Sequence, residues 1–211
     1  MYYGTDDCLL TPSSTAVPYD SQSPVVVIPN AIPPIHLWKA MALVQSTTGV
    51  QSETYGTDGT PIKSNLRTSL AYPHVKMGGT DLLDSLVAKV AKASFRTKLK
   101  NLSAGWDIIS YTSGGEFVLH HDSGYKDVAT GKVVTLNKRK LTGVLYFNTQ
   151  GESFLGGDIE FPYLRDTVTG KSLKITPVSG TLVVFPSNFS FSHVVHPVIT
   201  GTRVCAVKFF E

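Results

Sequence analysis

The chain has 211 residues, of which 42% are hydrophobic and 17% are charged, and its formal net charge at pH 7 is +3. This composition excludes wholesale disorder, and the length fits one domain with a sizeable core. The slight basic excess argues against nucleic acid as a partner, and no window is apolar enough to span a bilayer.

Residues 1–23 are rich in Ser, Thr, Asp and Pro, and we expect them to form a tail or an extended arm outside the core. They lack the basic and apolar regions of a signal peptide. The two cysteines, Cys8 and Cys205, are too few for a disulfide scaffold. These features predict a soluble cytoplasmic protein with no membrane partner.

Three elements are predicted ahead of residue 100. Residues 24–28 form a short β-branched run closed by a proline and an asparagine, which predicts a buried strand. Residues 35–45 and 80–99 carry apolar side chains at helical spacing, and two aspartates in the first turn of the second run suit a helix N-terminus. Between these helices, the polar residues 47–65 predict a surface loop.

From residue 106 onward the chain changes to short β-rich runs separated by Gly, Pro, Asn and Asp. The runs are residues 106–111, 116–122, 141–148, 157–161, 172–176, 181–185, 193–198 and 202–210. Short strands at this spacing predict a mainly β fold, a double-stranded β-helix (jelly roll) with the N-terminal helices packed on one sheet. We therefore expect a single domain over residues 24–211, with a jelly-roll core over about 106–211.

Three residues in two of the predicted strands form a candidate metal site. His120 and Asp122 end one predicted strand, and His193 begins a later one. Because side chains alternate along a strand, His120 and Asp122 share a face and His121 points away. Two imidazoles and one carboxylate form the facial triad of non-haem Fe(II) oxygenases. The alternative is a surface turn, since His-x-Asp by itself arises by chance.

The other four histidines do not fit this triad. His121 has the wrong face, His196 follows His193 by an odd number of positions, and His36 and His74 lie in the N-terminal region. We assign surface or hydrogen-bonding roles to all four.

The residues around the triad give the chain a resemblance to the prolyl 4-hydroxylase-like branch of the Fe(II)/2-oxoglutarate-dependent dioxygenases, over nearly its whole length after residue 24. The matching residues are Arg67-Thr68-Ser69 ahead of the long helix, Tyr111, Gly114 and Phe117 ahead of His120, Arg139, Thr142 and Tyr146-Phe147-Asn148 on the next strand, Gly156-Gly157 leading to Phe161-Pro162, Pro177 to Gly180 ahead of Phe185, Pro197-Val198 four residues after His193, and Arg203 ten residues after it.

The resemblance implies that His120, Asp122 and His193 bind Fe(II). It further implies that Arg203 and the hydroxyl of Tyr146 bind the far carboxylate of 2-oxoglutarate. Tyr111 and Thr142 would complete that pocket. Most relatives carry Lys where this chain has Arg203, although other 2-oxoglutarate oxygenases use Arg.

The residues themselves leave alternatives open at this second pocket. Arg203 could be an ordinary surface residue, and Tyr146 could be a core aromatic residue with a satisfied hydroxyl. Alternation nevertheless puts Arg203, Cys205 and Val207 on one face of a strand, where a charge among apolar neighbours needs a partner.

The implied reaction uses Fe(II), 2-oxoglutarate and O2, with ascorbate as a supporting reductant, to hydroxylate an unactivated C–H bond and release succinate and CO2. A proline-containing peptide or protein is the preferred substrate, because proline-rich segments dock in aromatic grooves. Residues 123–140 are polar and basic at their end, and we expect a mobile loop that folds over the peptide; a hairpin without function is the alternative.

Other functions remain open. Similar scaffolds hydroxylate free amino acids and other small molecules. The basic runs Lys138-Arg139-Lys140 and Arg96 to Lys100 suggest nucleic-acid dealkylation, but the second C-terminal arginine of such enzymes is missing after Arg203. A non-catalytic jelly-roll binding module is a further alternative. Retention of Asp122 favours hydroxylation over halogenation.

Overall fold

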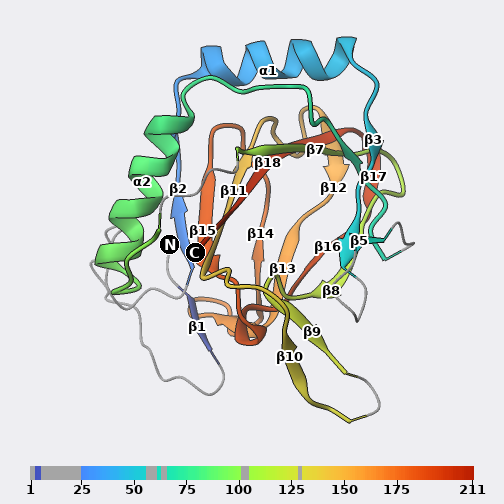
Figure 1. The fold of residues 1–211 in the computed structure, drawn as a ribbon. Coiled ribbons are helices and arrows are strands. Elements are labelled where there is room, and N and C mark those ends of the chain that lie inside the picture. Colours follow the sequence, from blue (N-terminus) through green and yellow to red (C-terminus); the bar gives the residue numbers. More distant parts are fainter. Residues whose placement is uncertain (1–2, 6–24, 56–60, 63–65, 101–104, 128–129) are drawn as a thin grey trace.

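The computed structural model describes residues 3–5, 25–55, 61–62, 66–100, 105–127 and 130–211. Two antiparallel sheets face each other, and two helices pack on the outer side of the larger sheet (Figure 1). The helix α1 (Pro34–Ser46) runs across the top of this view, and α2 (Thr80–Ala93) lies along its left side. The predicted jelly roll with helices on one sheet is therefore confirmed.

The larger sheet has antiparallel neighbours throughout its described strands. In spatial order these are β2 (Val26–Ile28), β15 (Leu182–Pro186), β11 (Leu141–Tyr146), β18 (Arg203–Phe210), β7 (Asp107–Tyr111), β6 (Leu70–Ala71) and β3 (Val50–Gln51). In the central register, Cys205 lies opposite Tyr146, and Arg203 lies opposite Tyr111. Three of the predicted 2-oxoglutarate residues, Tyr111, Tyr146 and Arg203, are thereby brought near one another.

The smaller sheet carries two of the three predicted metal ligands, His120 and His193. Its strands are β1 (Tyr3–Thr5), β13 (Ile159–Asp166), β16 (His193–Val195) and β8 (Phe117–His120), with β14 (Ser172–Ile175) also paired to β13. The remaining elements are the pairs β4 (Thr54–Tyr55) with β5 (Pro61–Ile62), β9 (Gly124–Lys126) with β10 (Val133–Thr135), β12 (Phe154–Gly156) with β17 (Val198–Gly201), and a short 3-10 helix, η1 (Phe189–Phe191).

Alternation along the strands of the larger sheet creates two apolar clusters, one on each side of it. On β18, Val204 and Ala206 face outward, and Cys205 faces the smaller sheet. The helix α2 packs its apolar stripe into the outer cluster, as its pattern predicted. The buried residues of that stripe are Leu83, Val87, Val90 and Ala91.

The structure corrects several predicted boundaries. The helix expected over 80–99 ends at Ala93, because Arg96 has a left-handed φ of 48° that an α-helix does not accommodate. The expected surface loop over 47–65 contains β3, β4 and β5. The expected tail contains β1, which pairs with β13, and the other residues before 25 lie outside the described ranges.

The strand boundaries near the candidate site also differ from the prediction. The strand expected over 116–122 ends at His120, so Asp122 lies in the turn that follows it. The strand expected over 193–198 is divided into β16 and β17. Pro197 lies at the break, where its ring removes a backbone donor. Neither helix in the described part of the chain is long and apolar enough to cross a membrane.

Candidate active site

Three predicted metal ligands converge at one end of the smaller sheet. β8 and β16 are antiparallel and place His120 directly opposite His193, while the turn after β8 brings Asp122 back to the pair. The three ligand atoms lie within 4.8 Å of one another. Nε2 of His120 is 3.6 Å from Oδ1 of Asp122, and Nε2 of His193 is 3.9 Å from Oδ2. This spacing suits a cluster around one small cation.

Backbone carbonyls orient both imidazoles. Nδ1 of His120 lies 2.8 Å from the Val118 carbonyl oxygen, and Nδ1 of His193 lies 3.0 Å from the Phe191 carbonyl oxygen. Because a carbonyl can only accept, each Nδ1 carries the proton and each Nε2 presents its lone pair to the cluster. Burial and the neighbouring His193 lower the pKa of His120 to about 3, which keeps that ring neutral.

The carboxylate of Asp122 is held from a neighbouring strand. Its Oδ2 accepts a hydrogen bond of 2.7 Å from Oγ1 of Thr142 on β11. Burial raises the pKa of Asp122, but the two imidazoles and this hydrogen bond outweigh burial and lower it. The Asp122 carbonyl oxygen accepts from Nδ2 of Asn137 and Nη1 of Arg139, at 3.1 and 3.0 Å. The carboxylate is therefore ionised and fixed in orientation.

The neighbouring histidines lie outside this cluster. His121 is buried on the other side of the turn, with Nδ1 3.1 Å from Oγ of Ser123 and its ring edge-on to Phe189. His196 lies 2.5 Å from Oε2 of Glu160. His36 packs beside the glycines that precede α2, and His74 is exposed. These positions agree with the hydrogen-bonding and surface roles expected for them.

A second group of buried polar side chains, which we call the Arg203 pocket, lies between the two sheets. Arg203 on β18 is 1% exposed, and its guanidinium carbon lies 5.0 Å from the ring centre of Tyr111 and 5.1 Å from that of Tyr146. Its Nη1 donates to Sγ of Cys205 at 3.3 Å. Close packing continues at Gly157, where a Cβ would lie 2.8 Å from Cδ of Arg203. Only glycine fits there.

Two buried polar atoms of Arg203 and Tyr146 lack hydrogen-bond partners. No carboxylate of the described residues forms an ion pair with Arg203, and its Nε and the Tyr146 hydroxyl make no hydrogen bond there. Burial raises the pKa of Tyr146 to about 12, so the phenol stays protonated and can donate. An unsatisfied buried donor costs about 1–3 kcal/mol. A carboxylate ligand would satisfy both groups, which is the chemistry expected of 2-oxoglutarate.

The four residues predicted to bind 2-oxoglutarate divide into two groups. Tyr111, Tyr146 and Arg203 form the Arg203 pocket. Thr142 lies on the inward face of β11 with Tyr146, but its hydroxyl bonds Asp122 and lies 2.9 Å from Oγ of Ser187. Its contacts therefore link Thr142 to the three clustered candidate ligands, which we call the metal cluster.

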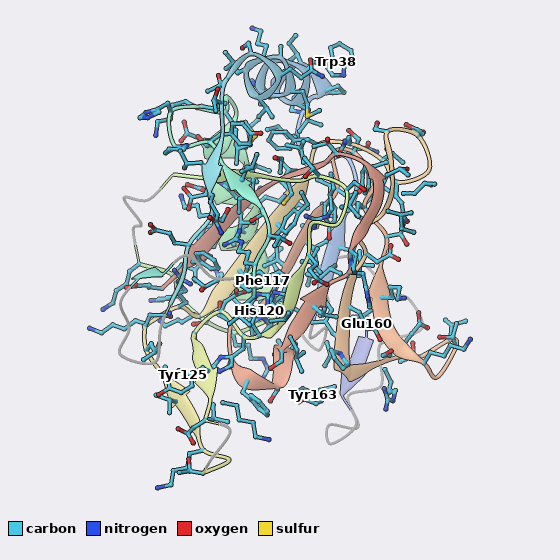
Figure 2. All side chains as sticks on the ribbon, turned by 90° about the vertical axis from the view of Figure 1, so that its right-hand side faces the viewer. Trp38, Phe117, His120, Tyr125, Glu160 and Tyr163 are labelled. Carbon is cyan, nitrogen blue, oxygen red and sulfur yellow. The ribbon has the colours of Figure 1, made fainter. Side chains whose placement is uncertain are left out.

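An open cleft of about 580 Å³ borders the metal cluster, and we call it the active-site cleft. Figure 2 shows Phe117 beside His120 near the centre, with Tyr125 and Tyr163 below them on either side. Phe117 stacks on His120 at 3.4 Å between ring centres, and Tyr163 packs at 5.4 Å from Phe189. Several aromatic side chains therefore line the cleft, together with charged and aliphatic ones.

Residues 123–140, predicted to be a mobile loop that folds over a peptide, contain the hairpin of β9 and β10 in their described part. Its base is attached to the site: the Leu136 amide donates to the Ser123 carbonyl, and Asn137 donates to Asp122. Its Tyr125 and Lys126 line the active-site cleft. The contacts of Asn137, Ser187 and Tyr163 could not be predicted from the sequence, because they depend on how distant strands align.

A family model described as the 2OG-Fe(II) oxygenase superfamily matches residues 106–211. The chain belongs to this superfamily. The enzyme is accordingly a 2-oxoglutarate-dependent dioxygenase, and the family implies Fe(II), 2-oxoglutarate and O2 as its cofactor set. The matched residues contain the three clustered metal ligands and the Arg203 pocket. The resemblance inferred from the sequence is thus confirmed.

Solved structures share the fold. A Trichoplax adhaerens prolyl hydroxylase in complex with a hypoxia inducible factor oxygen degradation domain peptide fragment has a TM-score of 0.64 at 16% identity, covering 89% of this chain and 84% of that chain. A Pseudomonas putida prolyl-4-hydroxylase has a TM-score of 0.60 at 18% identity, with coverages of 89% and 92%. A viral collagen prolyl hydroxylase from Paramecium Bursaria Chlorella virus-1, in complex with 2-oxoglutarate, has a TM-score of 0.60 at 16% identity, with coverages of 89% and 95%. No curated protein sequence matches the chain.

Proposed function

We propose that this dioxygenase hydroxylates an unactivated C–H bond of a prolyl residue in a peptide or protein. The observation that carries the proposal is the convergence of His120, Asp122 and His193 on the border of an open cleft that several aromatic side chains line. A polypeptide can enter such a cleft and bring one residue to the cluster. The Arg203 pocket provides a separate place for the co-substrate.

The three clustered residues would hold Fe(II) through Nε2 of each histidine and a carboxylate oxygen of Asp122. Three protein ligands on one face leave the opposite positions open for a co-substrate and O2. When bound, iron supplies the oxygen activation that protein side chains cannot perform. Thr142 acts through Asp122, because its hydroxyl holds the carboxylate in the ligating orientation.

Arg203 and Tyr146 would bind the far carboxylate of 2-oxoglutarate. The guanidinium offers a planar pair of donors and the phenol a third, all away from bulk water. Tyr111 on the opposite side and Cys205 below restrict where the guanidinium can lie. The pocket thus selects a ligand that ends in an anion.

The proposed reaction is balanced by its two co-substrates. One oxygen atom of O2 enters the C–H bond of proline, and the other enters succinate as 2-oxoglutarate loses CO2. Decarboxylation supplies two electrons and the C–H bond supplies two, which together reduce O2. The apolar inner cluster keeps water from the reacting groups. Ascorbate would serve only to keep the iron in its ferrous state.

Two observations favour proline as the substrate residue. Phe117, Tyr163 and Phe189 are aromatic groups on the cleft wall, and proline-rich segments present a preformed extended helix to such grooves. The three structures compared above are prolyl hydroxylases, one of them in complex with a peptide fragment. Free amino acids and other small molecules remain the alternative substrates.

The structure weakens one observation that suggested nucleic-acid dealkylation, the basic run around Arg139. Arg139, the centre of the basic run, lies 3.6 Å from the Phe209 ring centre and donates to the Asp122 carbonyl. Its guanidinium is therefore engaged with the candidate site from within the fold.

The test is oxygenation of defined peptides. The enzyme is incubated with Fe(II), 2-oxoglutarate, O2 and ascorbate, together with proline-containing peptides or the same peptides with Pro→Ala. We expect one added oxygen atom by mass spectrometry, equimolar succinate, and neither product with His193→Ala. Oxygenation of a free amino acid but of no peptide would replace the proposed substrate, and absence of succinate under every condition would overturn the proposed catalysis.

A further inference from the structure

A second cavity lies beside the active-site cleft, and we call it the distal cavity. Its volume is about 450 Å³, and it lies where β6 and β7 meet the segment that leads into α2. Its floor consists of buried apolar side chains, and its rim is charged. The floor residues are Tyr72, Val75, Met77, Trp106 and Ile108.

The two cavities share a wall. Glu53, Arg67 and Asp107 line both the distal cavity and the active-site cleft. Arg67 is positioned by a hydrogen bond of 3.0 Å from its Nε to Oγ of Ser69, and its guanidinium carbon lies 5.0 Å from the Phe117 ring centre. Phe117 in turn stacks directly on His120, so the Phe117 ring links Arg67 of the shared wall to a proposed metal ligand. The distal cavity and the active-site cleft are therefore adjacent.

The chemistry of the distal cavity selects an apolar group. Arg67 and Lys76 contribute two positive charges to its lining, and Glu53 and Asp107 contribute two negative ones, so the lining has no net charge. Such a rim gives no preference to a phosphate or to an acidic side chain. The buried aromatic and aliphatic floor instead favours burial of a hydrophobic side chain.

We propose that the distal cavity is a substrate exosite, which binds an apolar side chain of the same polypeptide whose proline is hydroxylated. The inference rests on the function proposed above. An extended chain advances about 3.3 Å per residue, so the anchoring side chain and the target proline are separated by several residues. The cavity then determines which prolines are modified, because a proline without this neighbour is bound through the cleft alone.

The first test compares peptides and a cavity-filling variant. A minimal peptide of about five residues is compared with a longer one that carries a single leucine at successive distances on either side of the proline. We expect one leucine position to lower KM by roughly tenfold to hundredfold relative to the same peptide with Leu→Ser, with kcat unchanged. Ala71 lines only the distal cavity, so Ala71→Trp should abolish this advantage and leave the minimal peptide unaffected.

The matched control is Ala42→Trp, which adds the same ring to an exposed position of α1. It should change neither KM. Equal KM values for all peptides with the wild-type enzyme would overturn the exosite, and so would an Ala71→Trp effect of equal size on the minimal and the leucine-containing peptides.

A second measurement does not depend on turnover. The chain has two tryptophans, Trp38 on the exposed face of α1 and Trp106 in the floor of the distal cavity. In Trp38→Phe, the leucine-containing peptide should change Trp106 fluorescence and its Leu→Ser counterpart should not. This titration tests the exosite even if Ala71→Trp does not fold or no peptide is oxygenated. A change without oxygenation would retain the exosite and reject the proposed reaction, whereas oxygenation with no change would reject the exosite alone.

Discussion

Two buried cations on the same strand have opposite surroundings. Arg203 begins β18 and faces inward, whereas Lys208 lies near the end of the same strand and faces outward. Their side chains are 1% and 4% exposed. Nζ of Lys208 lies 2.7 Å from Oδ2 of Asp84 on α2, and the other oxygen of Asp84 accepts from Nε1 of Trp106 at 2.9 Å. Arg203 faces two tyrosines and a thiol, and no carboxylate of the described residues pairs with it.

We interpret Lys208 as a charge with a structural role and Arg203 as a charge that binds a ligand. A buried cation is costly unless an anion compensates it, and Lys208 obtains that anion from the chain itself. The Asp84 contact thereby attaches α2 to the outer face of the larger sheet. Arg203 also requires an anion, and none of the carboxylates that the structure describes supplies one. We infer that inner-face substitutions will alter catalysis and that outer-face substitutions will alter stability.

The largest effect is expected at the metal cluster. Replacing His120, Asp122 or His193 singly by Ala should abolish peptide oxygenation and most Fe(II) binding, since each residue provides one vertex of the face. Iron affinity is measured by titration under anaerobic conditions. His121→Ala is the matched control and should be much milder, because its ring lies outside the cluster. The reverse ranking would show that the wrong histidine is assigned.

Arg203→Met tests the unpaired cation directly. Charged hydrogen bonds contribute about 1.5–3 kcal/mol, so KM for 2-oxoglutarate should rise by roughly tenfold to hundredfold while iron binding is retained. Arg203→Lys should recover part of this loss, because the charge survives without the fork geometry. Without co-substrate, thermal unfolding of Arg203→Met should show no loss of stability. An unchanged KM would mean that another group binds the far carboxylate.

Thr142→Val keeps the shape of the side chain but removes its hydrogen bond to Asp122. Loss of a contact that orients a ligand should weaken Fe(II) binding by roughly tenfold, with KM for 2-oxoglutarate little changed. Ser187→Ala is the control, since Ser187 contacts Thr142 and not the carboxylate of Asp122. A rise confined to KM for 2-oxoglutarate would return Thr142 to the co-substrate pocket, as the sequence first suggested.

The smallest catalytic effect is expected from Asp84→Asn on the outer face. Lys208 would lose its counter-charge, and the free energy of unfolding should fall by about 1–3 kcal/mol. The thermal midpoint should then fall by roughly 2–4 °C for each kcal/mol. kcat and both KM values should remain those of the wild type. Asp81→Asn, in the same helical turn, is the control. An equal fall in the free energy of unfolding for both variants would show that the Asp84–Lys208 contact does not stabilise the fold.

Much of the site could be predicted because it depends on short-range geometry. His120 and Asp122 are two residues apart, so a strand and its turn bring them to one side whatever the rest of the fold does. The same alternation placed Arg203 and Cys205 together on the inward face. The hydrogen bond between Thr142 and Asp122 could not be predicted, because Asp122 lies 20 residues away and follows a strand of the other sheet.

The sequence by itself determined the fold class, the pattern of inward and outward residues, and the types of ligand available, since periodicity and side-chain chemistry are local properties. The tertiary structure decided which charges are compensated. Asp84 and Lys208 are 124 residues apart, and Arg67 meets Phe117 only because the segment before α2 lies along the cleft. Packing of distant segments sets such contacts. For this reason the paired cation, the unpaired cation and the distal cavity became visible only in the folded chain.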